Sequence, residues 1–194
     1  RQENHQRRTL RHPFTGEPTF TCEFRALMYL QKRGVPVPVP VFFGERTVDG
    51  QARAILMTQE LVGFKSLEDV TNELFSGAKA SVSVQRQILR GTALAVKSMH
   101  AARSLHRSLY PKHLFVRWPS EAVPEVVLID LEKSRIKCLP TIRTVYDLAT
   151  LNRSVASLRQ PARMFFFLQY LGVPSLNWWH KFLCRLIIMR TAKN

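Results

Sequence analysis

Apolar residues recur at helical spacing along much of the chain. In the segment 19–33 they share one face of a predicted helix, which Gly34 ends, and this face comprises Phe20, Phe24, Leu27, Met28 and Leu30. The same periodicity predicts a short helix and four longer ones, over residues 66–74, 84–102, 146–158, 162–171 and 175–190. Ser175 is the predicted N-cap of the last helix. Helices therefore dominate the second half of the chain.

The first half contains the signals of a β-hairpin. Residues 35–41 alternate valine with proline, and they must be extended because each proline keeps its predecessor out of the helical region. Asp49-Gly50 indicates a tight turn between a strand over 41–45 and a returning strand over 51–61. The buried part of the returning strand is expected at 54–57. Helices and strands in this order predict an α+β fold.

A polar loop and two short apolar strands follow the long helix. The loop reads His106-Arg-Ser-x-x-x-x-His113, the strands cover 114–116 and 126–129, and the second strand ends in Asp130-Leu-Glu. Protein kinases carry H-R-D-x-x-x-x-N and then D-F-G in this layout, with a catalytic aspartate and two metal-binding residues. The chain keeps the spacing, but Ser108 replaces the catalytic aspartate and His113 replaces the metal-binding asparagine.

These substitutions change the expected chemistry. Asp130, at the end of a buried strand, is placed either to hold Mg²⁺, which prefers oxygen ligands, or to serve as a carboxylate in a structural turn. His113 is a poorer Mg²⁺ ligand, so it binds Mn²⁺, reaches the metal through water, or hydrogen-bonds within the loop. His106 is expected to pack beneath the acid in a structural role. Ser108 cannot act as a base without activation, and a base contributes roughly 10²–10⁴-fold, so slow or absent transfer is predicted while nucleotide binding need not suffer.

The segment 131–147 is short and contains no A-P-E element. This argues against a protein substrate held by a long activation loop and suits a compact acceptor such as a sugar. Lys133, Arg135 and Lys137 either bind phosphates on that acceptor or form a solvated basic loop. Asp147 is expected to anchor the catalytic loop from behind by accepting backbone hydrogen bonds, as the matching acid does in kinase folds.

The net charge of +15 and the pI of about 10.6 favour a polyanionic partner: nucleic acid, anionic lipid head groups or a phosphorylated sugar. An unspecialised basic surface is the alternative. The chain has no nucleic-acid recognition motif, so nucleic acid is not expected. Its longest apolar runs fall far short of the ~20 residues that span a bilayer. Its cysteines, Cys22, Cys138 and Cys184, are scattered and odd in number, which predicts buried thiols in a reducing compartment.

The end of the chain is basic and aromatic, with Trp178, Trp179, Lys181, Phe182, Arg185, Leu186, Arg190 and Lys193. An aromatic stripe at helical spacing usually belongs to the core, and we favour that interpretation. The alternative is a helix that lies on an anionic membrane surface.

Six segments carry a family resemblance. They are Arg1-Gln-Glu-Asn-His5, Arg11-His-Pro13, Glu23-Phe-Arg-Ala-Leu27, Gly34-Val-Pro-Val-Pro38, His106-Arg-Ser-Leu-Tyr-Pro-Lys-His-Leu-Phe-Val116 and Leu128-Ile-Asp-Leu-Glu-Lys-Ser-Arg135. In them the chain resembles the lipopolysaccharide kinase family, the Kdo/WaaP/InaA group of bacterial kinase-like proteins, and most of all its InaA branch. The last two segments are the most specific, because their ordered pair is much rarer than either alone.

The resemblance implies a protein-kinase-like, two-lobed α+β fold with a mainly helical large lobe and a small lobe truncated at its N-terminal side. Residues 1–62 would be the small-lobe remnant with helix, hairpin and hinge, and residues 63–194 the large lobe with the catalytic and metal-binding loops. The implied cofactors are ATP and Mg²⁺, with Mn²⁺ as an alternative. The implied acceptor is a lipopolysaccharide core sugar or another anionic glycolipid, reached by a cytoplasmic protein peripheral to the inner membrane.

The resemblance also assigns residues to roles. Glu23 matches the helix glutamate that pairs with a nucleotide-binding lysine, and Glu60, Leu61 and Val62 match the hinge that holds the adenine. Ser108, Asp130 and His106 fall on catalytic-loop positions, and His113 and Asp130 on metal-binding ones. No lysine precedes Lys32, so the nucleotide-binding lysine is expected just before Arg1, with a glycine-rich strand pair further upstream.

Two functions stay open at this point. The first is ATP-dependent phosphorylation of a core-sugar hydroxyl. The second is that of a pseudokinase, a stress-related ATP-binding or scaffold protein without phosphotransfer, because Ser108 removes the usual base.

Overall fold

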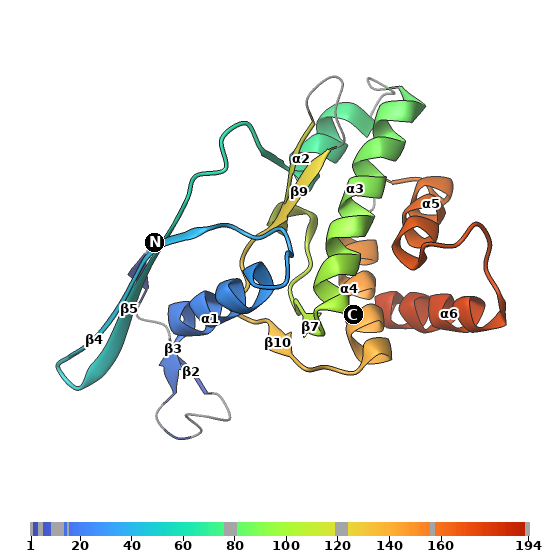
Figure 1. The fold of residues 1–194 in the computed structure, drawn as a ribbon. Helices are drawn as coiled ribbons and strands as arrows, with labels where there is room; N and C mark the ends of the chain where they lie inside the picture. Colours follow the sequence, from blue (N-terminus) through green and yellow to red (C-terminus); the bar gives the residue numbers. More distant parts are fainter. Residues whose placement is uncertain are drawn as a thin grey trace.

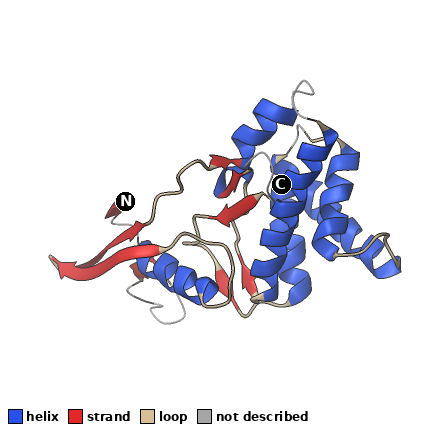
Figure 2. Ribbon diagram, turned by 45° about the horizontal axis from the view of Figure 1, so that its top comes forward, coloured by secondary structure: helices blue, strands red, loops and turns tan. Residues whose placement is uncertain are grey.

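The computed structural model describes residues 2–3, 6–8, 14, 16–75, 81–118, 124–155 and 158–192. The motif positions 1, 4–5 and 11–13, and Lys193, lie outside these residues. A long hairpin and the first helix form one end of the molecule, and a group of helices forms the other (Figures 1 and 2). This is the mixed α+β fold that the sequence predicts, whereas the division at residue 62 stays a prediction.

The hairpin consists of β4 (Pro40–Val48) and β5 (Gln51–Thr58), and β1 (Gln2–Glu3) extends it to a sheet in the order β1-β5-β4. Val48 pairs with Gln51, and the turn residues Asp49 and Gly50 have φ of 52° and 73°. A type I′ turn requires positive φ at both positions. The predicted hairpin is therefore confirmed, although β4 is longer and β5 is shorter than expected.

Helix α1 (Thr19–Gln31) packs against β4 and β5. The Phe24 ring stacks on the Phe43 ring with the centroids 4.3 Å apart. Met28 was expected on the buried face, but it is 47% exposed. The prediction was wrong because Met28 lies about 100° further round the helix than the buried Leu27.

Only half of the predicted buried run 54–57 is buried. Ala54 and Leu56 lie in the core, whereas Ile55 and Met57 are exposed. Neighbouring residues of a strand point to opposite faces of the sheet, and α1 covers the face that carries Ala54 and Leu56.

The remaining helices form the other end of the molecule. They are α2 (Leu67–Val70), which passes into the π-helical turn η1 (Thr71–Phe75), and α3 (Val82–Ala101), α4 (Pro140–Ser154), α5 (Gln160–Leu171) and α6 (Trp178–Ala192). All were predicted, but two of them begin three or more residues away from the predicted position. α4 begins six residues earlier than expected, with Pro140 in its first turn, where the missing N–H costs nothing. α6 begins after Asn177, whose Oδ1 accepts a hydrogen bond from His180 N (2.9 Å), so the N-cap prediction for Ser175 was wrong.

Helix α3 is central to this end (Figure 1). Its apolar face is buried, as predicted, and comprises Ile88, Leu89, Ala93, Val96 and Met99. Gly91 lies on the side that faces the segment before β9 (Glu125–Leu128). A Cβ at Gly91 would lie 3.0 Å from Pro124 O, so glycine permits the close approach of helix and strand.

Several short strands complete the fold. β6 (Lys65–Ser66), β8 (Leu114–Arg117) and β9 form a sheet in the order β6-β8-β9. Two antiparallel pairs accompany it: β2 (Gln6–Arg7) with β3 (Glu17–Pro18), and β7 (Ser104–Leu105) with β10 (Arg135–Ile136). The loop between β7 and β8, which includes the 3₁₀ turn η2 (Pro111–His113), is thereby held at both ends.

The aromatic stripe on α6 is not in the core. Trp178 is 77% exposed, Trp179 42% and Phe182 44%. The core interpretation is therefore wrong for these residues, because α6 turns its other side, with Leu183 and Ile187, towards the molecule. None of the described helices has both the length and the apolarity needed to cross a membrane.

The cysteines are free thiols, as predicted, although each is half-buried and not fully buried. Burial raises the pKa of the Cys22 and Cys184 thiols, because desolvation disfavours the thiolate. Both are therefore protonated at neutral pH.

Candidate functional site

The pairing of β8 with β9 brings the end of the polar loop next to Asp130. Leu114 pairs with Leu128 in the antiparallel ladder. One residue beyond that pair, Ile129 N donates a hydrogen bond to His113 O (3.0 Å). His113 and Asp130, which are distant in sequence, therefore lie side by side.

The His113 side chain links the loop to Asp130. Its Nδ1 lies 2.8 Å from Ser108 O, and its Nε2 lies 3.1 Å from Asp130 Oδ2. A carbonyl oxygen only accepts hydrogen bonds, so Nδ1 carries a hydrogen. Nε2 then donates to Asp130 only when the ring is protonated. In the neutral ring, the lone pair of Nε2 and Asp130 Oδ2 are both available to one cation.

Asp130 has two features that mark it as a functional candidate. Its φ of 58° lies in the left-handed region, which costs about 1–3 kcal/mol for a residue other than glycine. Its Oδ1 atom is buried and has no hydrogen-bond partner among the described residues. Strain and an unsatisfied carboxylate oxygen are tolerated where a ligand supplies the missing partner.

The donor set fits a hard divalent ion held mainly by its substrate. Among the described residues no group of three or more His, Cys, Asp and Glu side chains surrounds a common point. Mg²⁺ in nucleotide sites is typically held by one or two carboxylates together with phosphate oxygens and water. Asp130 with its unpartnered oxygen meets that need, and the imidazole of His113 suits Mn²⁺ better than Mg²⁺.

His106 supports the loop from below, as expected. It is fully buried, and its Nε2–H donates to Ile129 O at 3.0 Å. Its ring is nearly parallel to that of His113, with the centroids 6.1 Å apart. Burial lowers the pKa of His106, with a further lowering from His113, and the nearby Asp147 offsets only part of this. The ring is therefore neutral at pH 7, with Nδ1 unprotonated.

Asp147, on α4, anchors the loop from behind, and this prediction is confirmed. Its Oδ2 accepts from His106 N (2.8 Å) and its Oδ1 from Arg107 N (2.9 Å). His100, near the end of α3, adds a third hydrogen bond from Nε2 to Oδ2 (3.0 Å). The carboxylate is fully buried and bonded to all three donors.

The hydrogen-bond network continues into α5 through Tyr170, a contact that was not predicted from the sequence. The Tyr170 hydroxyl lies 2.8 Å from His100 Nδ1 and 2.8 Å from Thr144 Oγ1. Burial raises the pKa of Tyr170, because desolvation disfavours the phenolate. A signal was present for one member: His100 continues the apolar spacing of Ala93 and Val96 on α3, where a polar residue needs a buried partner.

Ser108 is buried in the middle of this loop. Its carbonyl accepts from Tyr110 N at 2.8 Å as well as from His113. Among the described residues its hydroxyl makes no hydrogen bond to a carboxylate or an imidazole, so no general base is positioned to activate it.

The other predicted site residues belong to other elements. Glu23 is half-buried on α1, and Glu60 and Val62 are exposed in the segment that leaves β5. The Val62 carbonyl accepts a hydrogen bond from Arg117 (3.3 Å). The basic residues after Asp130 are exposed, and they are Lys133, Arg135 and Lys137.

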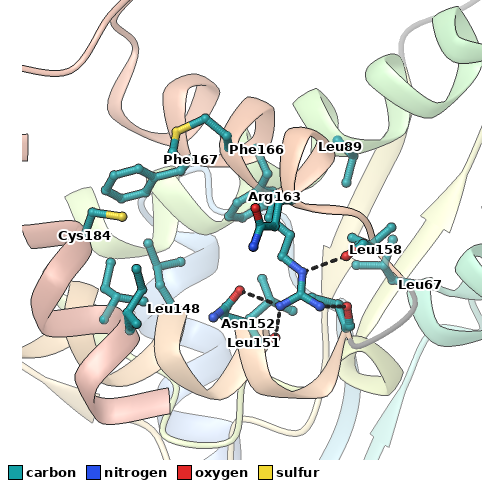
Figure 3. A pocket seen from close by; sticks show the side chains of 15 residues that line it. Leu67, Leu89, Leu148, Leu151, Asn152, Leu158, Arg163, Phe166, Phe167 and Cys184 are labelled. Atoms are coloured by element: carbon teal, nitrogen blue, oxygen red, sulfur yellow. Dashed lines mark hydrogen bonds between the residues drawn. The ribbon is translucent and has the colours of Figure 1, made fainter. Parts of the chain in front are cut away.

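A separate, apolar cavity of about 420 Å³ lies among α3, α4, α5 and α6 (Figure 3). Apolar side chains line most of it, and the Arg163 side chain is one of its few polar lining groups. The Arg163 guanidinium donates to Leu158 O and Val155 O at 2.8 Å each and to Asn152 Oδ1 at 3.2 Å. The Arg163 guanidinium therefore links α5 to the C-terminal end of α4.

These features define a class of protein. A helix, a loop held by a buried aspartate, and a second acid at a strand end paired with the last side chain of the loop form the catalytic-loop arrangement of kinase-like folds. The solved structure of WaaP in complex with acyl carrier protein agrees in fold, with a TM-score of 0.72, 24% sequence identity, and coverage of 88% of this chain and 73% of that chain.

Residues 1–179 match the model of the lipopolysaccharide kinase (Kdo/WaaP) family. The chain belongs to this family.

Two relatives give the degree of similarity. Protein InaA of Escherichia coli (strain K12) is 34% identical over 135 residues, which cover 70% of this chain and 61% of that protein. Lipopolysaccharide core heptose(I) kinase WaaP of Escherichia coli is 29% identical over 119 residues, which cover 59% of this chain and 44% of that protein. The chain therefore matches about half the length of these relatives.

Proposed function

We propose that the chain forms part of an ATP-dependent phosphotransferase that acts on a hydroxyl of a lipopolysaccharide core sugar. The observation that carries this proposal is the His113–Asp130 pair. Asp130 Oδ1 is buried and has no hydrogen-bond partner among the described residues, and Asp130 Oδ2 lies 3.1 Å from His113 Nε2. Membership of a family of lipopolysaccharide kinases supports the reaction class.

Each site residue has a role in the proposal. Asp130 and His113 hold the metal, and Glu23 orients the lysine that binds the nucleotide phosphates. The segment Glu60–Val62 contacts the adenine edge. The magnesium ion, when bound with ATP, supplies positive charge to the phosphate oxygens, and phosphoryl transfer depends mostly on such positioning and charge stabilisation. His106 and Asp147 fix the loop, so that little reorganisation is needed.

Ser108 sets the expected rate. Because no described residue takes the place of the catalytic aspartate as a base, the acceptor hydroxyl must lose its proton to water or to the transferred phosphate. We expect transfer slower by about 10²–10⁴-fold than in an enzyme with a base.

The test is ATP turnover by the full-length protein with purified core oligosaccharide, for the wild type, Asp130→Ala and Ser108→Asp. Turnover that Asp130→Ala abolishes and Ser108→Asp increases is the expected result. Wild-type turnover that persists in Asp130→Ala would show that the metal position is assigned to the wrong residue.

The second candidate function is that of a pseudokinase: a stress-related, ATP-binding or scaffold protein. The Ser108 substitution favours it, as does the finding that no described residue is placed to activate the Ser108 hydroxyl. Mg-ATP binding without turnover, measured by calorimetry on the full-length protein, would support it. Failure to bind Mg-ATP at millimolar concentration would exclude both nucleotide hypotheses.

We also propose peripheral contact with an anionic membrane through α6, at the cytoplasmic face of the inner membrane. The exposed Trp178, Trp179 and Phe182 lie on the same helix as the exposed, basic Lys181. Aromatic and basic side chains together favour anionic interfaces.

An acyl carrier protein is a further proposed partner. The solved WaaP structure contains one, and a chain of net charge +15 suits an acidic protein surface. Saturable association that weakens with salt would support this partner.

A further inference from the structure

A polar pocket of about 400 Å³ lies beside the catalytic loop. The described residues that line it include no acidic one, and they are Arg107, Tyr110, Tyr146, Thr150, Arg153 and Arg190. Three different parts of the chain contribute: the loop after β7, helix α4 and helix α6. The apolar cavity of Figure 3 is a different one and shares no lining residue with this pocket.

None of the described residues compensates the positive charge of this pocket. Among the described residues, the guanidinium groups of Arg107, Arg153 and Arg190 make no ion pair and no hydrogen bond, although all of them are half-buried. Arg163 and Arg143, in contrast, donate to backbone carbonyls. Three adjacent half-buried cations repel one another, so an anion from outside would relieve both repulsion and desolvation.

The pocket is also held in shape before a ligand arrives. Arg107 has φ of 69°, and its backbone N–H donates a hydrogen bond to Asp147 Oδ1 at 2.9 Å. This hydrogen bond fixes the position of the Arg107 Cα, from which the side chain extends. Arg190 lies over the Tyr146 ring, with Cζ 4.0 Å from the centroid. Planar guanidinium groups bind phosphate through paired hydrogen bonds, and the tyrosine hydroxyls add donors of the same kind.

The pocket adjoins the proposed transfer site. Tyr110 lines the pocket, and its ring meets the His113 ring edge-on with the centroids 5.7 Å apart. His113 in turn pairs with Asp130. Arg107 immediately precedes Ser108 in the loop. A ligand in the pocket therefore lies next to the position of the reacting hydroxyl.

We propose that this pocket binds a phosphate monoester carried by the acceptor saccharide. The role of this pocket in the reaction rests on the proposed function. In that reaction, the acceptor would be a sugar that already bears a phosphate group. A dianionic phosphate matches the cluster better than a single carboxylate, because it carries more charge and more acceptor oxygens. The exposed Lys133, Arg135 and Lys137 are not needed for this binding.

The test is calorimetric titration of the full-length protein, at low salt and without nucleotide or metal. The probes are inorganic phosphate, glucose 6-phosphate, glucuronate and glucose. The variants are Arg153→Gln and Arg190→Gln, with Arg185→Gln as the matched control, since Arg185 lies exposed on the same helix as Arg190 and its loss changes the net charge equally. Arg190→Lys keeps the charge without the planar group and serves if a glutamine variant unfolds.

Glucose 6-phosphate and inorganic phosphate are expected to bind with one site per chain, and glucose not at all. Each pocket variant should weaken binding about tenfold or more, from the loss of a charged hydrogen-bond partner, while Arg185→Gln binds as the wild type does. Arg190→Lys should bind at an intermediate level. Asp130→Ala should retain phosphate binding, so failure of phosphotransfer and failure of this proposal give different results.

Four outcomes would overturn the proposal. Equal weakening in Arg185→Gln would show binding to diffuse surface charge. Absence of saturable binding at millimolar phosphate would remove the site. Glucuronate binding as tightly as glucose 6-phosphate would assign the pocket to carboxylates. Loss of phosphate binding in Asp130→Ala would move the anion to the transfer site.

Discussion

Removing the Asp147 carboxylate tests whether the catalytic loop depends on this one buried side chain. The carboxylate accepts hydrogen bonds from two backbone amides of the loop, His106 N and Arg107 N, and from His100 Nε2. Asp147→Ala leaves all three donors without an acceptor in a buried site. Asp147→Asn leaves the shape nearly unchanged and replaces one oxygen by an NH₂ group.

The structure gives different magnitudes for the two variants. Each unsatisfied buried donor costs about 1–3 kcal/mol, so three donors cost Asp147→Ala about 3 kcal/mol or more, even if water enters the space left behind. In Asp147→Asn, an amide oxygen at the Oδ2 position keeps the bonds from His106 N and His100 Nε2. Only the Arg107 N–H loses its acceptor, which corresponds to about 1–3 kcal/mol.

The measurement is urea unfolding of the full-length protein, followed by circular dichroism, with the free energy of unfolding obtained by linear extrapolation. Asp69→Asn is the control: Asp69 is an exposed carboxylate that accepts from Ser66 Oγ at 2.6 Å, and its replacement should cost less than about 1 kcal/mol. Amide hydrogen exchange should quicken at Arg107 in both Asp147 variants and at His106 chiefly in Asp147→Ala.

Two results would refute this reasoning. A cost below about 1 kcal/mol for Asp147→Ala would mean that the buried donors readily find other partners. Equal costs for alanine and asparagine would mean that the negative charge matters and the hydrogen-bond geometry does not.

The remaining predictions concern three other features. Tyr170→Phe removes the hydroxyl between His100 and Thr144 and should lower the free energy of unfolding by about 1–2 kcal/mol; an unchanged urea midpoint would contradict the network. Burial lowers the pKa of folded His106, so the unfolded chain binds the proton more readily and stability should fall as the pH drops below about 6.5. His106→Gln should show a shallower acid slope, and an identical slope would place the titration elsewhere. Trp178→Ala with Phe182→Ala should reduce binding to anionic vesicles, whereas Leu94→Ala, which replaces an exposed residue on α3, should not; equal binding of all variants would remove α6 as the contact.

The sequence predicts a helix or strand well where particular residue types or a regular apolar pattern specify the local backbone. Asp49-Gly50 gives the hairpin because few other pairs accept positive φ at both positions. The α3 pattern is clear because one face of the helix is buried from Ile88 to His100. The predicted start of α4 at residue 146 was wrong, because the helix begins at Pro140 and proline favours the first turn of a helix.

Exposure and networks depend on packing, which the sequence alone does not specify. The α6 stripe has the spacing of a core face, but whether another element covers it is decided by the whole fold. Tyr170 reaches His100 across 70 residues of sequence because α5 packs on α3. The His113–Asp130 pair was foreseeable, in contrast, because two short antiparallel strands connect those residues and fix their register.

The geometry of Asp130 bears on whether the proposed metal site is still functional although Ser108 replaces the catalytic aspartate. A loop that had only to connect two strands would gain stability from relaxing Asp130 out of the left-handed region and exposing its carboxylate to water. Instead Asp130 keeps a strained backbone, an unpartnered buried oxygen and an oriented imidazole at 3.1 Å. These features lower the stability of the free protein, and a bound cation would offset that cost. We therefore expect cation and nucleotide binding to persist whether or not Ser108 permits transfer, so that metal affinity, more directly than turnover, reports the function of this site.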